Sequence, residues 1–140
     1  MSAAAVIAFG AATMAGVDLS STAAATPQAR GWTLGADAET KQNPVTPDEK
    51  TLAAGRAIFK QKCQRCHGPG GLGDGPDADP DGEDMDLTNP KRAERNPDGV
   101  VFYKVSNGRR SPKMPAFKEE LNEQQIWTVV TYVQSLRKKP

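Results

Sequence analysis

The sequence predicts an all-α domain in which three short helices are joined by two long loops. Apolar residues recur at helical spacing in three stretches, at 46–62, 96–107 and 122–136. The stretches between them, 68–90 and 109–118, are rich in residues that interrupt regular structure, mainly glycine, proline and aspartate. No strand pattern competes with this assignment.

The first helix has a clear predicted start. Thr46 is placed to cap it, Pro47 to occupy the first helical position, and Glu49 to close a capping box. Its apolar stripe leads into Cys63 and consists of Leu52, Gly55, Ile58 and Phe59.

The other two helices carry equally local signals. Asn96-Pro97 opens the second helix, and Asn107-Gly108 ends it. Asn122 is a predicted N-cap for the third helix, with Gln125 at the position that closes a capping box. The buried stripe of this helix is expected to be Ile126, Val129, Val130 and Val133.

The N-terminal region differs in composition from the rest of the chain. Small and apolar residues fill 3–17 and are followed by three alanines at 23–25, which resembles a secretory signal peptide. No lysine or arginine precedes Arg30, so the basic start of such a peptide is missing. A buried helix and a membrane anchor remain alternatives, although the run is shorter than the ~20 residues of a membrane span. Secretion to the periplasm is the preferred interpretation.

These observations define three expected regions in a chain of 140 residues. Residues 1–25 are a signal peptide or an N-terminal anchor, residues 26–45 are a linker from which Trp32 docks on the domain, and residues 46–140 are the domain. The hydrophobic fraction of 37% is low for a packed core, so a large apolar cofactor is expected to complete it. The net charge of +1 gives no indication of nucleic-acid binding.

Both cysteines lie in one motif, Cys63-Gln64-Arg65-Cys66-His67. This clustering excludes a disulfide framework, and the single histidine leaves too few ligands for a zinc site. The motif C-x-x-C-H is typical of covalent haem c attachment, in which each thiol adds to one vinyl group and the histidine lies under the iron. A redox-active dithiol is the alternative, but the β/α context of such enzymes is not visible.

A second axial ligand must come from a methionine, because the chain has no second histidine. Met114 is the preferred candidate, since Pro112 and Pro115 stiffen the loop that would hold its sulfur against the iron. Met85 is the alternative, but it lies in a stretch that should be solvated, with seven acidic residues in 74–86. An open sixth position is the third possibility.

From Thr46 to Leu136 the sequence resembles class I c-type cytochromes, especially the small bacterial periplasmic type with one haem. The matching features, in order, are Gly55 and Phe59 before Cys63, the C-x-x-C-H motif, Gly73-Asp74-Gly75-Pro76, the Lys-Met-Pro-Ala-Phe loop and the final Ile-Trp-x-Val-Val-x-Tyr-Val helix.

The resemblance implies a cytochrome c fold around one covalent haem. In this family the first and last helices cross closely at a glycine, so Gly55 should meet Val129 and Tyr132. A proline carbonyl accepts a hydrogen bond from the proximal histidine, and Pro76 is the candidate here. The acidic stretch from Asp77 to Asp86 departs from the shortest members of the family.

The implied function is single-electron transfer between respiratory or photosynthetic complexes, with no catalysis and no small-molecule substrate. Two basic groups should surround the haem opening and dock on an acidic, membrane-bound oxidase, reductase or reaction centre; they are Lys60, Lys62 and Arg65, and Arg109, Arg110, Lys113 and Lys118. The alternative for these charges is a scattered, solvated set. The alternative functions are a fixed haem subunit of a larger complex, and a haem enzyme or gas sensor with a labile sixth ligand.

Overall fold

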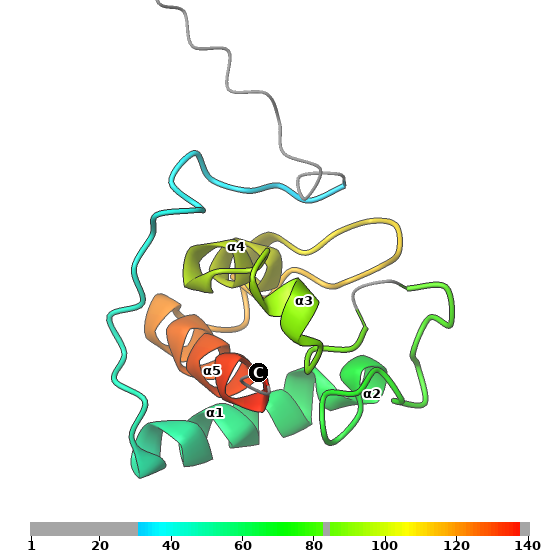
Figure 1. The fold of residues 1–140 in the computed structure, drawn as a ribbon, viewed down its shortest axis with the longest axis horizontal. Coiled ribbons are helices and arrows are strands. Elements are labelled where there is room, and N and C mark those ends of the chain that lie inside the picture. Colours follow the sequence, from blue (N-terminus) through cyan, green and yellow to red (C-terminus); the bar gives the residue numbers. More distant parts are fainter. Residues whose placement is uncertain (1–30, 83–84, 138–140) are drawn as a thin grey trace, which may run out of the picture.

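A computed structural model describes residues 31–82 and 85–137 and confirms the all-α fold class. The helices in this part of the chain are α1 (Glu49–Lys62), α2 (Gln64–His67), α3 (Pro90–Ala93), α4 (Asp98–Asn107) and α5 (Glu123–Leu136) (Figure 1). The described residues contain isolated β-bridges but no strand. The signal peptide or anchor expected at residues 1–25 lies outside the described residues.

Helices α1, α4 and α5 are the three that the sequence predicts, whereas α2 and α3 are additional. Each of these two helices has four residues, which is too short to produce a periodic pattern. α3 still carries a local signal, because Pro90 is its first residue and the Asn89 side chain accepts a hydrogen bond from the Lys91 amide.

The predicted cap of α1 is wrong by two residues. The helix begins at Glu49, and the Asp48 carboxylate accepts a hydrogen bond of 2.7 Å from the Thr51 amide. That hydrogen bond lowers the pKa of Asp48. Aspartate is as good a cap as threonine, so the sequence Thr-Pro-Asp-Glu offered two starts that local rules do not separate.

The predicted ends of α4 and α5 are confirmed. α4 follows Pro97 and stops at Gly108, which adopts a positive φ of 61°. α5 begins with the capping box formed by Asn122 and Gln125.

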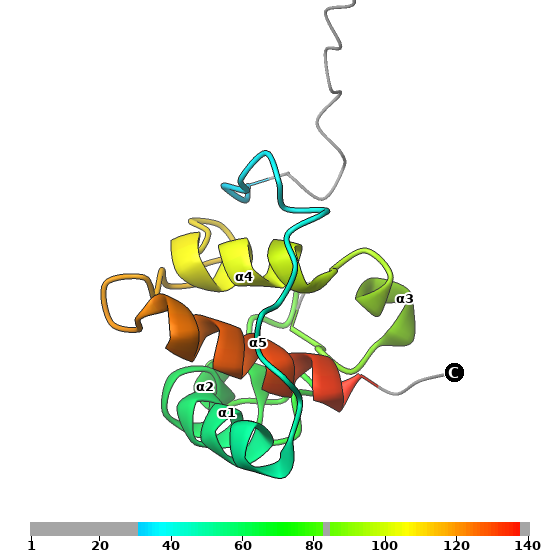
Figure 2. The same cartoon turned by 90° about the vertical axis from the view of Figure 1, so that its left-hand side faces the viewer.

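Helix α1 packs across α5 at Gly55, which is buried (Figures 1 and 2). A Cβ added there would lie 2.6 Å from the carbonyl oxygen of Thr128 and 2.6 Å from Cβ of Tyr132. Only glycine therefore permits this approach of the two backbones. The expected contact with Tyr132 is confirmed, while Thr128 takes the place expected for Val129.

The core lies between α1, α4 and α5. Phe59 of α1, Val100 of α4 and Val129 and Val130 of α5 are almost fully buried. At one side of the core Phe102 stacks on Trp127, with ring centroids 4.2 Å apart.

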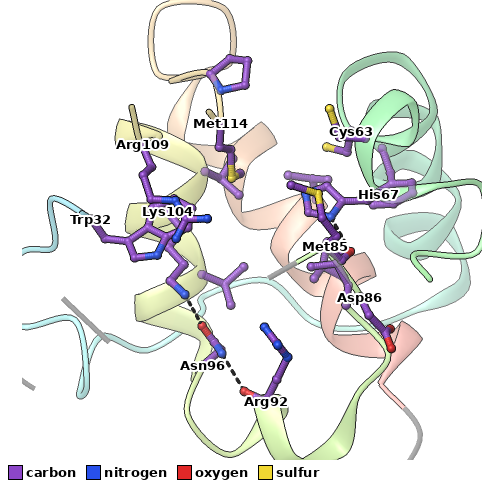
Figure 3. Close-up of a pocket in the computed structure, with 18 of the residues that line it drawn as sticks. Trp32, Cys63, His67, Met85, Asp86, Arg92, Asn96, Lys104, Arg109 and Met114 are labelled. Carbon is purple, nitrogen blue, oxygen red and sulfur yellow. Dashed lines mark hydrogen bonds between the residues drawn. The ribbon is translucent and has the colours of Figure 1, made fainter. Parts of the chain in front are cut away.

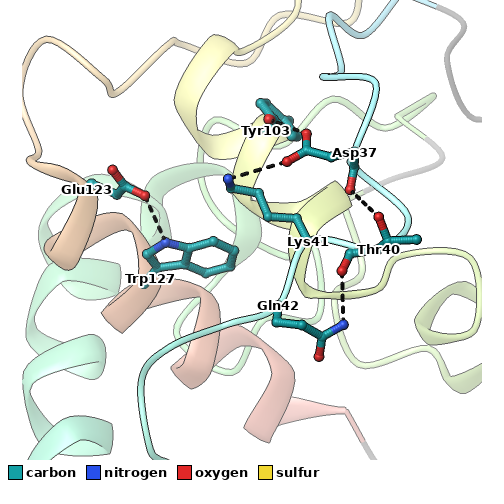
Figure 4. Close-up of polar contacts among 7 residues, drawn as sticks. All are labelled: Asp37, Thr40, Lys41, Gln42, Tyr103, Glu123 and Trp127. Atoms are coloured by element: carbon teal, nitrogen blue, oxygen red, sulfur yellow. Dashed lines mark hydrogen bonds and ion pairs between the residues drawn. The ribbon is translucent and has the colours of Figure 1, made fainter.

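Residues 31–45 form a segment that runs along α4 and α5 before α1 begins (Figure 2, cyan). We call it the N-terminal segment. The Tyr103 hydroxyl donates a hydrogen bond of 2.6 Å to the Asp37 carboxylate (Figure 4), and the Asn43 side-chain amide donates one of 2.9 Å to the Thr131 hydroxyl. Trp32 is buried, which confirms its expected docking on the domain. The segment is thus fixed to two helices along its length.

Replacing Gly55 with alanine should destabilise the fold. The new methyl group forces α1 and α5 apart, and this overpacking outweighs the helix propensity gained, for a net loss of about 1–2 kcal/mol. Chemical denaturation of the holoprotein measures the change. Gly70→Ala is the matched control, because a Cβ at Gly70 meets only Leu72, at 3.8 Å. Equal stability of the two variants would contradict the assigned role of Gly55.

The bond between Asp37 and Tyr103 should stabilise the fold over a defined pH range. It lowers the pKa of Asp37 below 3.8 and raises that of Tyr103 above 10.0. Its contribution is therefore present above pH 3.8 and lost as the pH falls further, and it is lost again as the pH rises above 10.0. The melting temperature of Tyr103→Phe should lie below that of the natural protein at neutral pH, and the gap should close on acidification. A gap that stays constant down to pH 2 would contradict this assignment.

Candidate functional site

The described residues line an open pocket between α1–α2, α4, α5 and the loop after α4 (Figure 3); its volume is about 980 Å³ when the solvent-filled mouth is included. Its interior is apolar and is formed by Phe59, Leu87, Val101, Val105, Val129 and Val133. The crossing of α1 and α5 places the end of α1 at this pocket, so the residues that follow α1 line one of its walls.

The C-x-x-C-H motif forms that wall. Cys63 is the C-cap of α1, and Cys66 and His67 lie on the single turn of α2. The His67 amide donates a hydrogen bond of 3.0 Å to the Cys63 carbonyl. Both sulfur-bearing side chains and the imidazole line the pocket. The two thiols therefore face one shared space, as attachment to a single macrocycle requires.

Burial raises the pKa of the Cys63 thiol to about 12, and the neighbouring Cys66 adds to the shift. At neutral pH the free thiol would remain protonated. Redox-active dithiols have the opposite property, a pKa lowered so that the attacking thiolate forms. The electrostatics of this site thus disfavour the redox-dithiol alternative.

The His67 ring is oriented by a backbone carbonyl. Its Nδ1 lies 2.8 Å from the carbonyl oxygen of Met85 (Figure 3). When Nδ1 donates its hydrogen to that oxygen, Nε2 carries the lone pair that can bind a metal, and the hydrogen bond increases the basicity of the ring.

The prediction that Pro76 supplies this carbonyl is therefore corrected. The chain around Pro76 is held instead against the outer side of the motif, because the Asp77 amide donates to the Arg65 carbonyl over 2.8 Å. The Arg65 guanidinium also pairs with the Asp77 carboxylate, at 2.7 Å. This pairing lowers the pKa of Asp77.

Met85 reaches His67 because the acidic stretch folds back on the motif. The Leu87 amide donates a hydrogen bond of 2.7 Å to the Gly71 carbonyl, and the Gly73 amide donates one of 2.8 Å to the His67 carbonyl. Met85 is consequently half-buried and lines the pocket. Asp74, Asp77 and Asp81 of the acidic stretch are exposed as expected, but Met85 itself is not solvated.

Met114 lies on another wall of the pocket, facing the motif (Figure 3). Its backbone is paired with that of Arg109 in both directions: the Arg109 amide donates to the Met114 carbonyl over 2.8 Å, and the Met114 amide donates to the Arg109 carbonyl over 2.9 Å. Met85, by contrast, shares the His67 side of the pocket. The positions of the two sulfurs favour Met114 as the group that faces His67 across the pocket.

A cationic margin borders the pocket on the side of α3 and α4. The sequence analysis expected Arg109 and Lys113 at the opening, but it did not identify Arg92, Lys104 and Arg137. The charged lining residues are Asp86 and the cations Arg92, Lys104, Arg109, Lys113 and Arg137. Arg137 donates to the Ala93 and Asn96 carbonyls over 3.1 Å each, and its Nε is buried with no hydrogen-bond partner in the described part of the chain. Burial lowers the pKa of this guanidinium. Such an excess of positive charge is suited to a ligand that carries carboxylates.

These features fit a haem. The apolar interior matches the macrocycle, the two thiols match its vinyl groups, His67 and Met114 offer nitrogen and sulfur from facing walls, and the cationic margin matches its two carboxylates. No group of three His, Cys, Asp or Glu side chains able to hold a bare metal ion occurs in residues 31–82 and 85–137.

Residues 50–133 match the family described as cytochrome c oxidase, cbb3-type, subunit III. The chain belongs to this family. It is a c-type cytochrome, and it holds one haem c covalently through Cys63 and Cys66.

Solved structures agree with the fold of the cytochrome. A chain of the reducing HAO-like protein complex of Kuenenia stuttgartiensis is similar with a TM-score of 0.58 and 32% identity, over 68% of this chain and 47% of the other. Cytochrome cL of Methylophaga aminisulfidivorans is similar with a TM-score of 0.54 and 24% identity, over 72% of this chain and 63% of the other. The cytochrome thus spans about half to two thirds of these chains. No curated protein matches.

None of the helices in the described ranges is long and apolar enough to cross a membrane.

Proposed function

We propose that this cytochrome is an exported carrier of single electrons, with His67 and Met114 as its axial ligands and no catalytic turnover of its own. The observation that carries the proposal is the placement of these two side chains on facing walls of the pocket that the attachment cysteines line. The haem, when bound, supplies the site at which one electron is taken up or released.

Residues of the chain attach the haem, orient His67, tune the potential and exclude water. Cys63 and Cys66 fix the macrocycle to α1 and α2, and the Met85 carbonyl holds the His67 ring in one orientation. Met114 provides a soft thioether that favours the reduced metal and raises the potential relative to two imidazoles. Phe59, Val101 and Val129 exclude water from the pocket interior. If His67 and Met114 both hold the iron, the bound haem would offer no open position to oxygen or peroxide.

The basic groups expected at the haem opening differ in how far their charge is available to a partner. Lys62 pairs with Glu120, and Arg65 pairs with Asp77, so Lys60 is the one exposed cation of the first group with no ion-pair partner among the described residues. On the Met114 side, Arg110, Lys113 and Lys118 are exposed and have no ion-pair partner among the described residues. We therefore place the docking surface on that side, and define it by these three residues. An acidic face of a periplasmic, membrane-bound oxidase, reductase or reaction centre is its proposed partner.

A fixed haem subunit of a larger assembly is the second candidate. Two observations support it: the family is described as an oxidase subunit, and the similar Kuenenia stuttgartiensis chain belongs to a protein complex. Copurification from the native membrane separates the two functions. A carrier elutes as a single cytochrome, whereas a fixed subunit elutes with its partners at constant stoichiometry.

Met114→Ala should lower the reduction potential by roughly 0.1 V or more, because the soft ligand that favours ferrous iron is removed. The ferrous variant should also bind carbon monoxide rapidly, which the natural protein should not. Redox titration and absorption spectroscopy measure both effects.

Met85→Ala is the matched control for this experiment. The substitution removes a second pocket-lining thioether but leaves the backbone carbonyl that bonds His67. Its potential should stay close to that of the natural protein. A fall in potential for Met85→Ala with none for Met114→Ala would show that the axial sulfur belongs to Met85.

Electron transfer to an acidic partner should slow as ionic strength increases, because salt screens the docking surface. The double variant Arg110→Glu and Lys118→Glu should lose about tenfold in the second-order rate at low salt. Lys50→Glu, at the end of α1 remote from the motif, is the control and should change the rate little. Stopped-flow kinetics over a salt series provide the measurement. A rate that does not depend on salt would remove the electrostatic docking proposal.

A further inference from the structure

The N-terminal segment lies outside residues 50–133, which carry the family resemblance, yet one of its residues lines the haem pocket. Trp32 is 9% exposed, and its backbone pairs with Arg109 in an antiparallel bridge. Arg109 in turn pairs with Met114. Three stretches of chain are thereby joined edge to edge, in the order Trp32, Arg109, Met114.

The Trp32 ring reinforces this arrangement through two cations. The Arg109 guanidinium lies 4.3 Å from the ring centroid, and the Lys104 ammonium lies 4.7 Å from it. Both distances are within the range of cation–π attraction. The same guanidinium donates to the Pro112 carbonyl over 3.1 Å, so it links the ring to the Met114 loop through its side chain as well as its backbone.

Two glycines permit the close approach of these three stretches. Gly31 has a φ of +76°, and a Cβ added there would lie 3.3 Å from Cδ of Arg109. Gly108 has a φ of +61°, and a Cβ added there would lie 2.3 Å from the Met114 carbonyl oxygen. The Asn107 side-chain amide also donates to the Thr33 carbonyl over 2.7 Å. Residues of the N-terminal segment and residues at the start of the Met114 loop therefore both contribute to the contact between them.

We propose that Trp32 is a positioning residue for the axial methionine: it holds Arg109, and through Arg109 the loop that presents Met114 to the pocket. Trp32 does not ligate the iron. It lowers the population of states in which the loop has moved away and the sixth position is open. The proposal rests on the function given above, in which Met114 is the axial ligand.

The test is imidazole binding to the ferric holoprotein, followed by visible absorption. An added ligand must displace Met114, so its apparent affinity is proportional to the population of the open loop. Loss of the two cation–π contacts in Trp32→Ala should raise this affinity by about tenfold. Leu34→Ala is the matched control, because Leu34 is half-buried in the same segment and does not line the pocket. It should bind imidazole like the natural protein.

A double-variant cycle shows whether Trp32 acts through Met114. In a Met114→Ala background no sulfur has to be displaced, so adding Trp32→Ala should change the affinity by no more than about twofold. A tenfold rise in both backgrounds would mean that Trp32 only shields the pocket, and would overturn the proposal. Equal affinities of Trp32→Ala and Leu34→Ala would overturn it as well.

Two further variants keep the test decisive if Trp32→Ala yields no holoprotein. Trp32→Phe retains an aromatic face and should stay within about threefold of the natural protein, whereas Lys104→Met removes one cation and should raise the affinity about threefold. An unchanged affinity for Lys104→Met would then contradict the proposal. Failure of the underlying function looks different: Met114→Ala alone would leave imidazole binding unaltered, and no sulfur ligand would exist for Trp32 to position.

Discussion

The structure depends on the contact between two helices at one glycine. Because α1 and α5 touch at Gly55, the end of α1 is carried to the face of α5 that bears Val129 and Val133. Cys63 therefore opens onto an apolar floor, and the haem is attached where the core is already packed. A chain with a hydrophobic fraction of 37% can form this core because the cofactor adds to it.

Backbone hydrogen bonds then place His67 and Met114 around the pocket that the helix contact creates. The chain after α2 folds back through Gly71 and Leu87, which brings the Met85 carbonyl to His67. On the other side, the turn after α4 folds back on Gly108, which presents Met114. Of the two proposed ligands, His67 lies on the single turn of α2 and its ring is oriented by a loop carbonyl, whereas Met114 lies in a loop. Irregular stretches of chain thus contribute to both sides of the site.

The sequence predicted those features that depend on a few adjacent residues. The C-x-x-C-H motif, the capping box at Asn122 and the stop at Gly108 are of this kind, and the attachment chemistry needs no knowledge of the fold. The helix start at Asp48 was missed because two equivalent caps compete within four residues.

The remaining differences come from contacts between distant residues. Pro76 was chosen on family resemblance, but the partner of His67 depends on where an 18-residue excursion of the chain returns. Composition identified the acidic stretch as solvated, which holds for Asp74, Asp77 and Asp81, but the hydrogen bonds of Gly73 and Leu87 on either side of the stretch bring Met85 to the pocket. No sequence motif identifies Arg137. Its place at the pocket margin depends on its hydrogen bonds to the carbonyls of Ala93 and Asn96, which are distant in sequence.

The group that orients His67 is a main-chain oxygen, which every amino acid possesses. Substitutions at position 85 leave this acceptor in place, so its identity is encoded in the path of the loop and not in a side chain. Homologous chains are then free to diverge in sequence through this region while keeping the same electronic environment at the histidine. Insertions and deletions between Gly73 and Leu87, which alter where the loop returns, are the changes that natural selection has reason to remove.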